Sequence, residues 1–189
     1  GFANAILEVI QKEKPTHIGV AFDLPGGTFR NEWFPEYKAN RQEQPEDITI
    51  AIPYVKKLVE AMDIPLLMIP GYEADDVMAT FAVKEPGPTR IVTGDRDLFQ
   101  MVDDKRDIKV VYLAKGISQH DLVDYAYIAN KYGIPGDRYA LFAMFRGDPS
   151  DGLPGVRGIG EKGAALIAQA FGNVDDALAG AHAAHDSLP

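Results

Sequence analysis

The sequence contains no cysteine, which excludes disulfide bridges and thiolate metal sites. It has no apolar run long enough to cross a bilayer, so we expect no membrane partner and a cytoplasmic location. Its first residues lack the basic and apolar segments of a signal peptide. Internal repeats and low-complexity tracts are also absent, and the four histidines show no spacing that argues for a metal site.

Basic residues are scarce, with 19 Lys and Arg against 28 Asp and Glu and a formal net charge of −9. The 189 residues suffice for one domain with a sizeable core, and 46% hydrophobic with 25% charged residues is typical of a globular protein. Overall acidity argues at first against a nucleic-acid partner, because phosphate binding favours a basic field. The positions of the acids matter more than their number.

The hydrophobic pattern alternates between strands and helices over the first half of the chain. It predicts strands at 17–22, 66–69, 90–93 and 108–113, and helices at 46–62, 73–84 and 96–102, with a kink or break at Pro53. From there the pattern is helical, at 118–132, 136–146 and 161–171. Alternating strands and helices predict an α/β fold with a mostly parallel central sheet flanked by helices. We expect an α/β core at 1–117, a helical subdomain at 118–180 and a frayed tail that includes 181–189.

Acidic side chains follow the predicted strands, at the point where each strand ends. In open α/β sheets these ends meet at one edge, where ligands bind. Carboxylates gathered there repel one another unless a cation lies among them, and hard oxygen ligands suit Mg²⁺ or Mn²⁺. Each acid alone is also explained as a helix cap or a first-turn residue. Their joint placement favours a metal site at the strand ends, where Asp23, Glu73, Asp75, Asp76, Asp95 and Asp97 lie. A further acidic pair, Asp148 and Asp151, opens the loop after a predicted helix.

The segment 29–41 mixes basic and aromatic residues. Its cations could contact phosphates, and its aromatic rings could stack on the bases of a single strand. The alternative is a surface helix with a buried aromatic face, which we favour for Trp33 and Phe34. The cations are Arg30, Lys38 and Arg41, and the third ring is Tyr37.

The glycine-rich segment 155–163 lies between two predicted helices. It is not a Walker phosphate loop, because Glu161 separates Gly160 from Lys162 and no Ser or Thr follows. Its glycines would expose backbone N–H groups that can hold a phosphate at a helix N-terminus. A plain tight turn explains the same spacing equally well.

Together these segments resemble the 5′–3′ exonuclease, or flap endonuclease, family, and in particular the 5′-nuclease domain of bacterial DNA polymerase I. The similarity runs in collinear order over about residues 5–180. Its motifs are Phe22-Asp23 with Thr28-Phe29-Arg30, Tyr37-Lys38-Ala39-Asn40-Arg41, Glu73-Ala74-Asp75-Asp76-Val77, Thr93-Gly94-Asp95-Arg96-Asp97, the run 147–156, and Gly158-Ile159-Gly160-Glu161-Lys162.

The resemblance implies a PIN-like or resolvase-like fold whose helical C-terminal subdomain carries a helix-hairpin-helix-like element. It implies two divalent cations, one group of ligands being Asp23, Glu73 and Asp75 with Asp76 beside them, and the other Asp95, Asp97, Asp148 and Asp151. Arg30, Lys38 and Arg41 would be catalytic cations of an arch at 28–45. DNA-binding residues would be Tyr37, Arg157, Gly158, Gly160 and Lys162, with a monovalent cation at the 155–163 hairpin.

The expected function is a metal-dependent, structure-specific 5′ nuclease that cuts DNA at a 5′ flap or 5′ end during replication and repair. We expect a monomer, either a stand-alone nuclease or an excised domain. Members of the family begin with a strand that ends in a ligand Asp, which this sequence lacks. Either that strand is missing from the chain shown, which we favour, or the protein is a shortened variant. The alternatives are a branched-DNA-binding module that does not cut, and a dehalogenase-type phosphatase. Against the phosphatase, Pro25 stands where a second Asp is needed.

Overall fold

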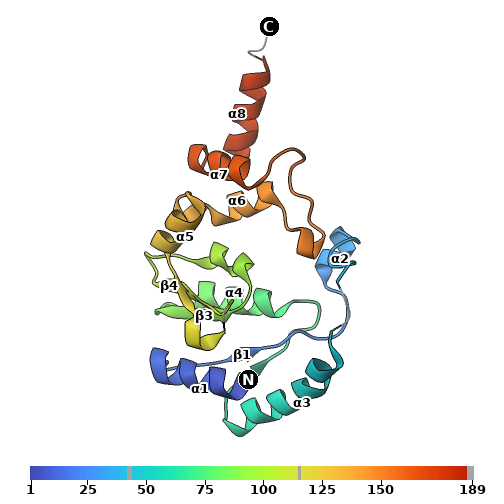
Figure 1. Cartoon of the computed structure of the whole chain (residues 1–189), viewed down its shortest axis with the longest axis vertical. Helices are drawn as coiled ribbons and strands as arrows, with labels where there is room; N and C mark the ends of the chain where they lie inside the picture. Colours follow the sequence, from blue (N-terminus) through green and yellow to red (C-terminus); the bar gives the residue numbers. More distant parts are fainter. Residues whose placement is uncertain (42–43, 115, 187–189) are drawn as a thin grey trace.

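The computed structural model describes residues 1–41, 44–114 and 116–186 (Figure 1). Strands lie in the middle of the molecule, with α1 (Phe2–Glu13) and α3 (Glu46–Ala61) at one end. The short helix α2 (Phe29–Trp33) lies to one side. The helical second half forms the other end, and α8 (Val174–Asp186) projects from it.

The strands form two hydrogen-bonded sets. β1 (Val20–Ala21) pairs in parallel with β2 (Leu66–Leu67), and β3 (Thr89–Thr93) pairs in parallel with β4 (Ile108–Tyr112). β5 (Asp121–Val123) adds an antiparallel strand to β4. Helix α4 (Ala74–Lys84) contacts both β1 and β3 and so spans the two sets. This arrangement confirms the predicted α/β fold with a mostly parallel sheet and a helical C-terminal part.

The single helix predicted at 118–132 is wrong. After a 3₁₀ turn, η2 (Ile117–Gln119), the chain extends as β5, because Val110–Tyr112 offers a free strand edge to residues 121–123. The helix α5 (Tyr125–Tyr132) begins only after Asp124, whose carboxylate accepts the N–H of Tyr127 at 2.8 Å. Sequence periodicity cannot reveal a strand edge supplied by another element, and the Asp124 cap was the local signal for the helix start.

Several other boundaries differ from the predictions. The first strand is shorter, the helix at 96–102 is a 3₁₀ helix, η1 (Arg96–Met101), and the one at 136–146 starts as η3 (Gly136–Arg138) before α6 (Tyr139–Arg146). The break predicted at Pro53 is wrong, since α3 runs through this exposed position, where proline removes one backbone hydrogen bond. The alternative, a kink at Pro53, stays a prediction.

The predicted fraying from Gly180 is also wrong. Helix α8 continues to Asp186, and alanine, the best helix former, dominates its second half. The final residues, 187–189, lie outside the described part of the chain. Helix α7 (Glu161–Ala170) packs against α6, as expected for the two helices that flank the glycine hairpin.

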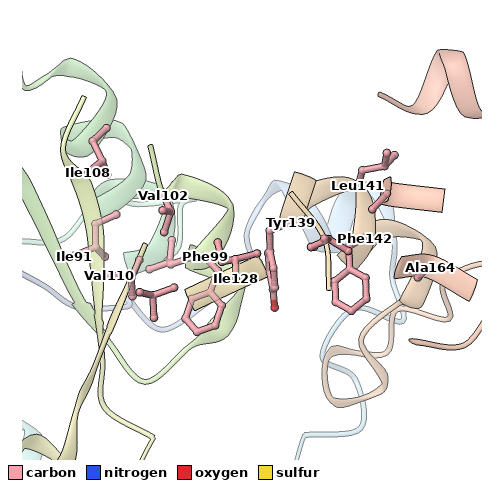
Figure 2. Close-up of a cluster of buried hydrophobic side chains, with 14 of the residues drawn as sticks. Ile91, Phe99, Val102, Ile108, Val110, Ile128, Tyr139, Leu141, Phe142 and Ala164 are labelled. Atoms are coloured by element: carbon pink, nitrogen blue, oxygen red, sulfur yellow. The ribbon is translucent and has the colours of Figure 1, made fainter. Parts of the chain in front are cut away.

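One hydrophobic core joins the sheet to the helical half (Figure 2). Phe99 of η1 and Val110 of β4 lie on one side of it, Phe142 of α6 lies on the other, and Tyr139 lies between them. A smaller cluster of Ile6, Val59 and Ile64 fixes α1 and α3. The core therefore crosses the predicted boundary at residue 117, and the division into subdomains stays a prediction. Within the described ranges, no helix is both long and apolar enough to span a bilayer.

Candidate metal and DNA-binding site

The acids at the strand ends are held by backbone hydrogen bonds that link neighbouring elements. Asp23, two residues beyond β1, accepts the N–H of Ala74 at 2.7 Å and so ties the strand end to the start of α4. Asp95, two residues beyond β3, caps η1 by accepting the N–H of Asp97 at 2.8 Å. These bonds explain how the predicted acids reach one edge of the sheet.

The crowding of negative charge raises the pKa of two of these acids. Burial, together with the charges of Asp95 and Asp23, raises the pKa of Asp75 to about 6. Burial and the charges of Asp95, Asp148 and Asp151 also raise the pKa of Asp97. Carboxylates from both predicted ligand groups therefore act on one another, and the crevice has more negative charge than its surroundings balance.

The last two acids lie in the loop after α6. Burial alone would raise the pKa of Asp148, but hydrogen bonds from the Ser150 hydroxyl and amide outweigh it, with help from Arg96 and Arg146, and the pKa falls. Asp151, in the 3₁₀ turn η4 (Pro149–Asp151), is buried as well. The lowered pKa keeps Asp148 charged at the edge of the crevice.

A close backbone crossing fixes this loop. Gly147 and Gly155 both have positive φ angles, +77° and +64°. A Cβ on Gly147 would lie 2.5 Å from the Gly155 nitrogen, so a side chain here would push apart the two backbone segments that cross. Only glycine fits, and the crossing sets the position of Asp148 and Asp151.

The three predicted catalytic cations reach the same acids. Arg30 donates two hydrogen bonds of 2.7 Å to the carboxylate of Asp76. The Lys38 ammonium lies 2.8 Å from Oε1 of Glu73.

Arg41 contacts Oδ1 of Asp151 at 2.6 Å. Like the contacts of Arg30 and Lys38, this is a short, charge-assisted hydrogen bond. From the sequence, only the resemblance to the 5′–3′ exonuclease family indicated that these cations lie near the acids. Figure 1 shows the orange loop around residue 150 next to α2.

The aromatic residues of the segment do not behave as predicted. Trp33 is 80% exposed, which contradicts a buried aromatic face, and its ring lies edge-on to Phe29 at 4.9 Å between centroids. Tyr37 is instead the buried residue, and its hydroxyl donates to Oε2 of Glu73 at 3.1 Å. In this arrangement Tyr37 positions Glu73, and its contact with DNA stays a prediction.

The residue types and charges suit divalent metal ions, because hard carboxylate oxygens gather where negative charge is in excess. Across the residues that the structure describes, however, no three acidic or histidine side chains are disposed to hold an ion directly. Several carboxylates are turned toward arginine and lysine. A cavity of about 270 Å³ opens beside them, lined by Arg41, Gly94, Asp95, Arg96, Tyr112, Asp148, Ser150 and Asp151.

The predicted DNA-binding residues of the hairpin lie apart from this cavity. Arg157, Gly158, Gly160 and Lys162 are all exposed in the segment that leads into α7. Gly158 has a φ of +84°, and a Cβ on Gly158 or Gly160 would meet nothing within 4 Å. The backbone of this turn is therefore open to a large ligand.

Two arginines beside the acids were not predicted from the sequence as site residues. Arg146 precedes the acidic loop, and its guanidinium lies 5.0 Å above the Phe142 ring, with both terminal nitrogens buried and without hydrogen-bond partners. Its charge and that of Arg96 lower the pKa of Asp148. Their neighbours in the sequence could have identified them. Arg96 lies between Asp95 and Asp97, and Arg146 directly precedes Gly147, which opens the acidic loop.

Replacing Asp75 with Asn is expected to stabilise the metal-free protein near neutral pH. Because the folded-state pKa is raised to about 6, the ionised carboxylate destabilises the fold increasingly as pH rises from about 4 to 6, and fully above that. After allowance for solvent screening, we expect a gain of about 1–2 kcal/mol at pH 7.5.

The gain should shrink to about 0.5 kcal/mol or less near pH 4, where Asp75 is protonated in the folded protein and about half ionised in the unfolded one. Urea unfolding in a chelator at the two pH values measures it. A variant that is less stable than the wild type at pH 7.5 would contradict the crowding of negative charge.

Comparison with known proteins identifies the family to which the chain belongs. Residues 1–133 match the family model described as 5′-3′ exonuclease, N-terminal resolvase-like domain. A 5′-3′ exonuclease of Streptomyces coelicolor is 41% identical, with 98% of this chain and 64% of that protein covered. DNA polymerase I of Mycobacterium bovis is also 41% identical, over 92% of this chain. The chain spans only 19% of that polymerase and less than two thirds of the exonuclease.

A solved structure shares the fold. It is a flap endonuclease of bacteriophage T5 in complex with DNA and metal ions, and it superposes with a TM-score of 0.75. The match covers 98% of this chain and 69% of the T5 protein at 22% identity, and at this identity it shows a shared fold and nothing more. With most of the chain matched by the family model and by relatives at about 40% identity, this protein belongs to the 5′–3′ exonuclease family.

Proposed function

We propose that this chain is a divalent-metal-dependent, structure-specific 5′ nuclease that hydrolyses phosphodiester bonds of DNA. One observation carries the proposal. Acids that follow three strands and one loop come together, and three cations of the segment 28–41 form ion pairs with three of these acids. Membership of the 5′–3′ exonuclease family supports it. So does the name of the Streptomyces coelicolor relative.

The acids would hold two divalent ions, Mg²⁺ or Mn²⁺, in the two groups that the resemblance implies. Such ions supply Lewis acidity and a bound water of lowered pKa. Asp97 and Asp75, which lack a basic partner among the ion pairs of the described residues, offer the charge that attracts them. Hard oxygen donors without histidine or cysteine favour these metals over zinc.

The cations would act on the DNA phosphate. In hydrolysis a water oxygen bonds to phosphorus, the bond from phosphorus to the leaving oxygen breaks, and negative charge grows on the phosphate oxygens. Lys38 and Arg41 lie beside Glu73 and Asp151 and are within reach of a phosphate bound there. A cation in this place stabilises the growing charge in the transition state. Arg30, which is paired with Asp76, would orient the strand.

The proposed substrate is DNA with a 5′ flap or a 5′ end. Incubation of the protein with end-labelled flap, nicked and gapped duplexes in Mg²⁺ or Mn²⁺ is expected to release mono- or short oligonucleotides near the junction. A chelator should abolish the products. Metal-independent binding without products would instead identify a non-cutting junction-binding module, and turnover of a chromogenic phosphate monoester would indicate a phosphatase.

The hairpin should grip the duplex through its two exposed cations. Replacing Arg157 and Lys162 together with alanine is expected to make the slope of log affinity against log salt about 1.8 less negative, because two phosphate contacts are lost. Fluorescence anisotropy with a labelled duplex at several salt concentrations measures the slope. A Lys57→Ala/Lys105→Ala protein, which loses two exposed lysines elsewhere, is the matched control. Equal slopes for the two proteins would contradict a DNA contact at the hairpin.

Three finer points are not tested by the contacts described above. They are the monovalent cation at the 155–163 hairpin, the monomeric state, and the role in replication and repair within the cytoplasm. Each stays a prediction. The open backbone of Gly158 and Gly160 is compatible with a ligand of main-chain oxygens there.

A further inference from the structure

The cations of the arch segment occupy carboxylate oxygens that the proposed metal ions need. Both oxygens of Glu73 are engaged, Oε1 by the Lys38 ammonium at 2.8 Å and Oε2 by the Tyr37 hydroxyl at 3.1 Å. Oδ1 of Asp151 is engaged by Arg41 at 2.6 Å, and Lys38 lies 4.0 Å from Oδ2. A divalent ion and an ammonium group cannot share the same oxygen at close range, since the two cations repel each other. Binding of metal and binding of these side chains are therefore competitive.

The backbone that carries Lys38 is held in this place by contacts with the acidic loop. The Lys38 N–H donates to the Asp151 carbonyl at 2.9 Å. Lys38 has a φ of +57°, a left-handed conformation that costs a non-glycine residue roughly 1–2 kcal/mol. Gly152, at φ +78°, lies so close to this turn that a Cβ would be 2.7 Å from the Glu36 carbonyl oxygen. The turn at 36–41 is thus docked on the loop in a conformation that it would not adopt alone.

Of the other acids of the crevice, Asp76 is held by two hydrogen bonds from Arg30, which lies outside the turn at 36–41. The remaining acids have no such partner among the ion pairs of the described residues. Within the ion pairs of the described residues, Asp75 and Asp97 have no lysine or arginine partner. Asp95 and Asp148 accept hydrogen bonds from neighbouring backbone N–H groups. A divalent ion would meet the oxygens of Asp75, Asp95, Asp97 and Asp148 without displacing a lysine or arginine. It would compete with basic side chains at Glu73 and Asp151, where the turn is docked, and at Asp76, which Arg30 holds.

We propose that the turn at 36–41 is a displaceable internal occupant of the metal site: divalent ions release Lys38 and Arg41 from Glu73 and Asp151, and the freed cations then bind the DNA phosphate. This rests on the proposed nuclease function and adds a regulatory step to it. Metal makes the phosphate-binding cations available, and a phosphate that takes these cations frees carboxylates for metal. The two ligands are therefore positively coupled, and the coupling is reciprocal.

Acylation of lysine amines on the wild-type protein, read by mass spectrometry, tests the release directly and without DNA. Saturating Mg²⁺ is expected to raise the acylation rate of Lys38 at least about fivefold, because its bond to Glu73 is lost. Lys12, paired with Glu8 on α1 outside the site, should react at an unchanged rate. Sodium chloride at matched ionic strength controls for screening.

A binding measurement separates this inference from the function on which it rests. Lys38→Met should bind Mn²⁺ about tenfold more tightly than the wild type in titrations followed by electron paramagnetic resonance, because one charge-assisted competitor is gone. Lys12→Met should bind like the wild type. Unchanged Lys38 acylation with saturating metal, or equal Mn²⁺ affinity for wild type and a folded Lys38→Met, overturns the inference and leaves the nuclease standing. Failure of every form to bind Mn²⁺ overturns both.

Discussion

Asp97→Asn is expected to abolish metal-dependent cleavage, with a loss in kcat of at least about 10³-fold, while the protein stays folded. Asp97 is half-buried, and the charges of Asp95, Asp148 and Asp151 raise its pKa beyond the effect of burial. Asn keeps the size of the side chain and removes its charge, so repulsion in the crevice falls and the fold is not weakened. The attraction for divalent ions falls with it, because Asp97 has no lysine or arginine partner among the ion pairs of the described residues.

Single-turnover cleavage of a 5′-flap duplex in Mg²⁺ measures this effect, and thermal unfolding in a chelator checks the fold. Asp47→Asn, in the exposed first turn of α3, removes the same charge far from the crevice and should cut like the wild type. An Asp97→Asn protein that retains cleavage within threefold of wild type would show that the acid crevice is not the reaction centre.

Phe142→Ala should lower the free energy of unfolding by about 3–5 kcal/mol, which corresponds to a fall in Tm of about 10 °C for a chain of this size. Phe142 is fully buried. Its ring lies 5.3 Å from that of Tyr132 and 5.9 Å from that of Tyr139, between centroids. Tyr139 in turn packs on Phe99 of η1, so the cavity would open in the core that joins the two halves (Figure 2).

Urea unfolding followed by circular dichroism measures the loss. Met144→Ala, on the exposed side of the same helix, controls for helix propensity and should change stability by less than about 0.5 kcal/mol. Because the core crosses residue 117, we expect one cooperative transition in both proteins. Two separate transitions would show that residues 118–180 unfold as an independent subdomain.

Much of the fold could be predicted because its signals are local. Apolar runs marked most strands, and glycines marked the joints between the later helices. The strand β5 could not be predicted, since residues 121–123 become extended only where β4 offers them an edge. Trp33 was misjudged for a related reason. A helix of five residues has too few neighbours to cover an aromatic ring, and this shows only when the packing is known.

The sequence by itself determined the α/β order of the chain and predicted the acids of the candidate site, because each acid follows a strand or a glycine turn and that order brings these points to one edge. Only the tertiary structure decided what those acids contact. Arg30 meets Asp76 across 46 residues, Lys38 meets Glu73 across 35, and Arg41 meets Asp151 across 110. The physical reason is that an ion pair depends on distances of a few Å. The Gly147–Gly155 crossing positions the loop that carries Asp151, and the backbone bond from Lys38 to Asp151 holds the turn against that loop. Neither feature leaves a periodic trace in the sequence.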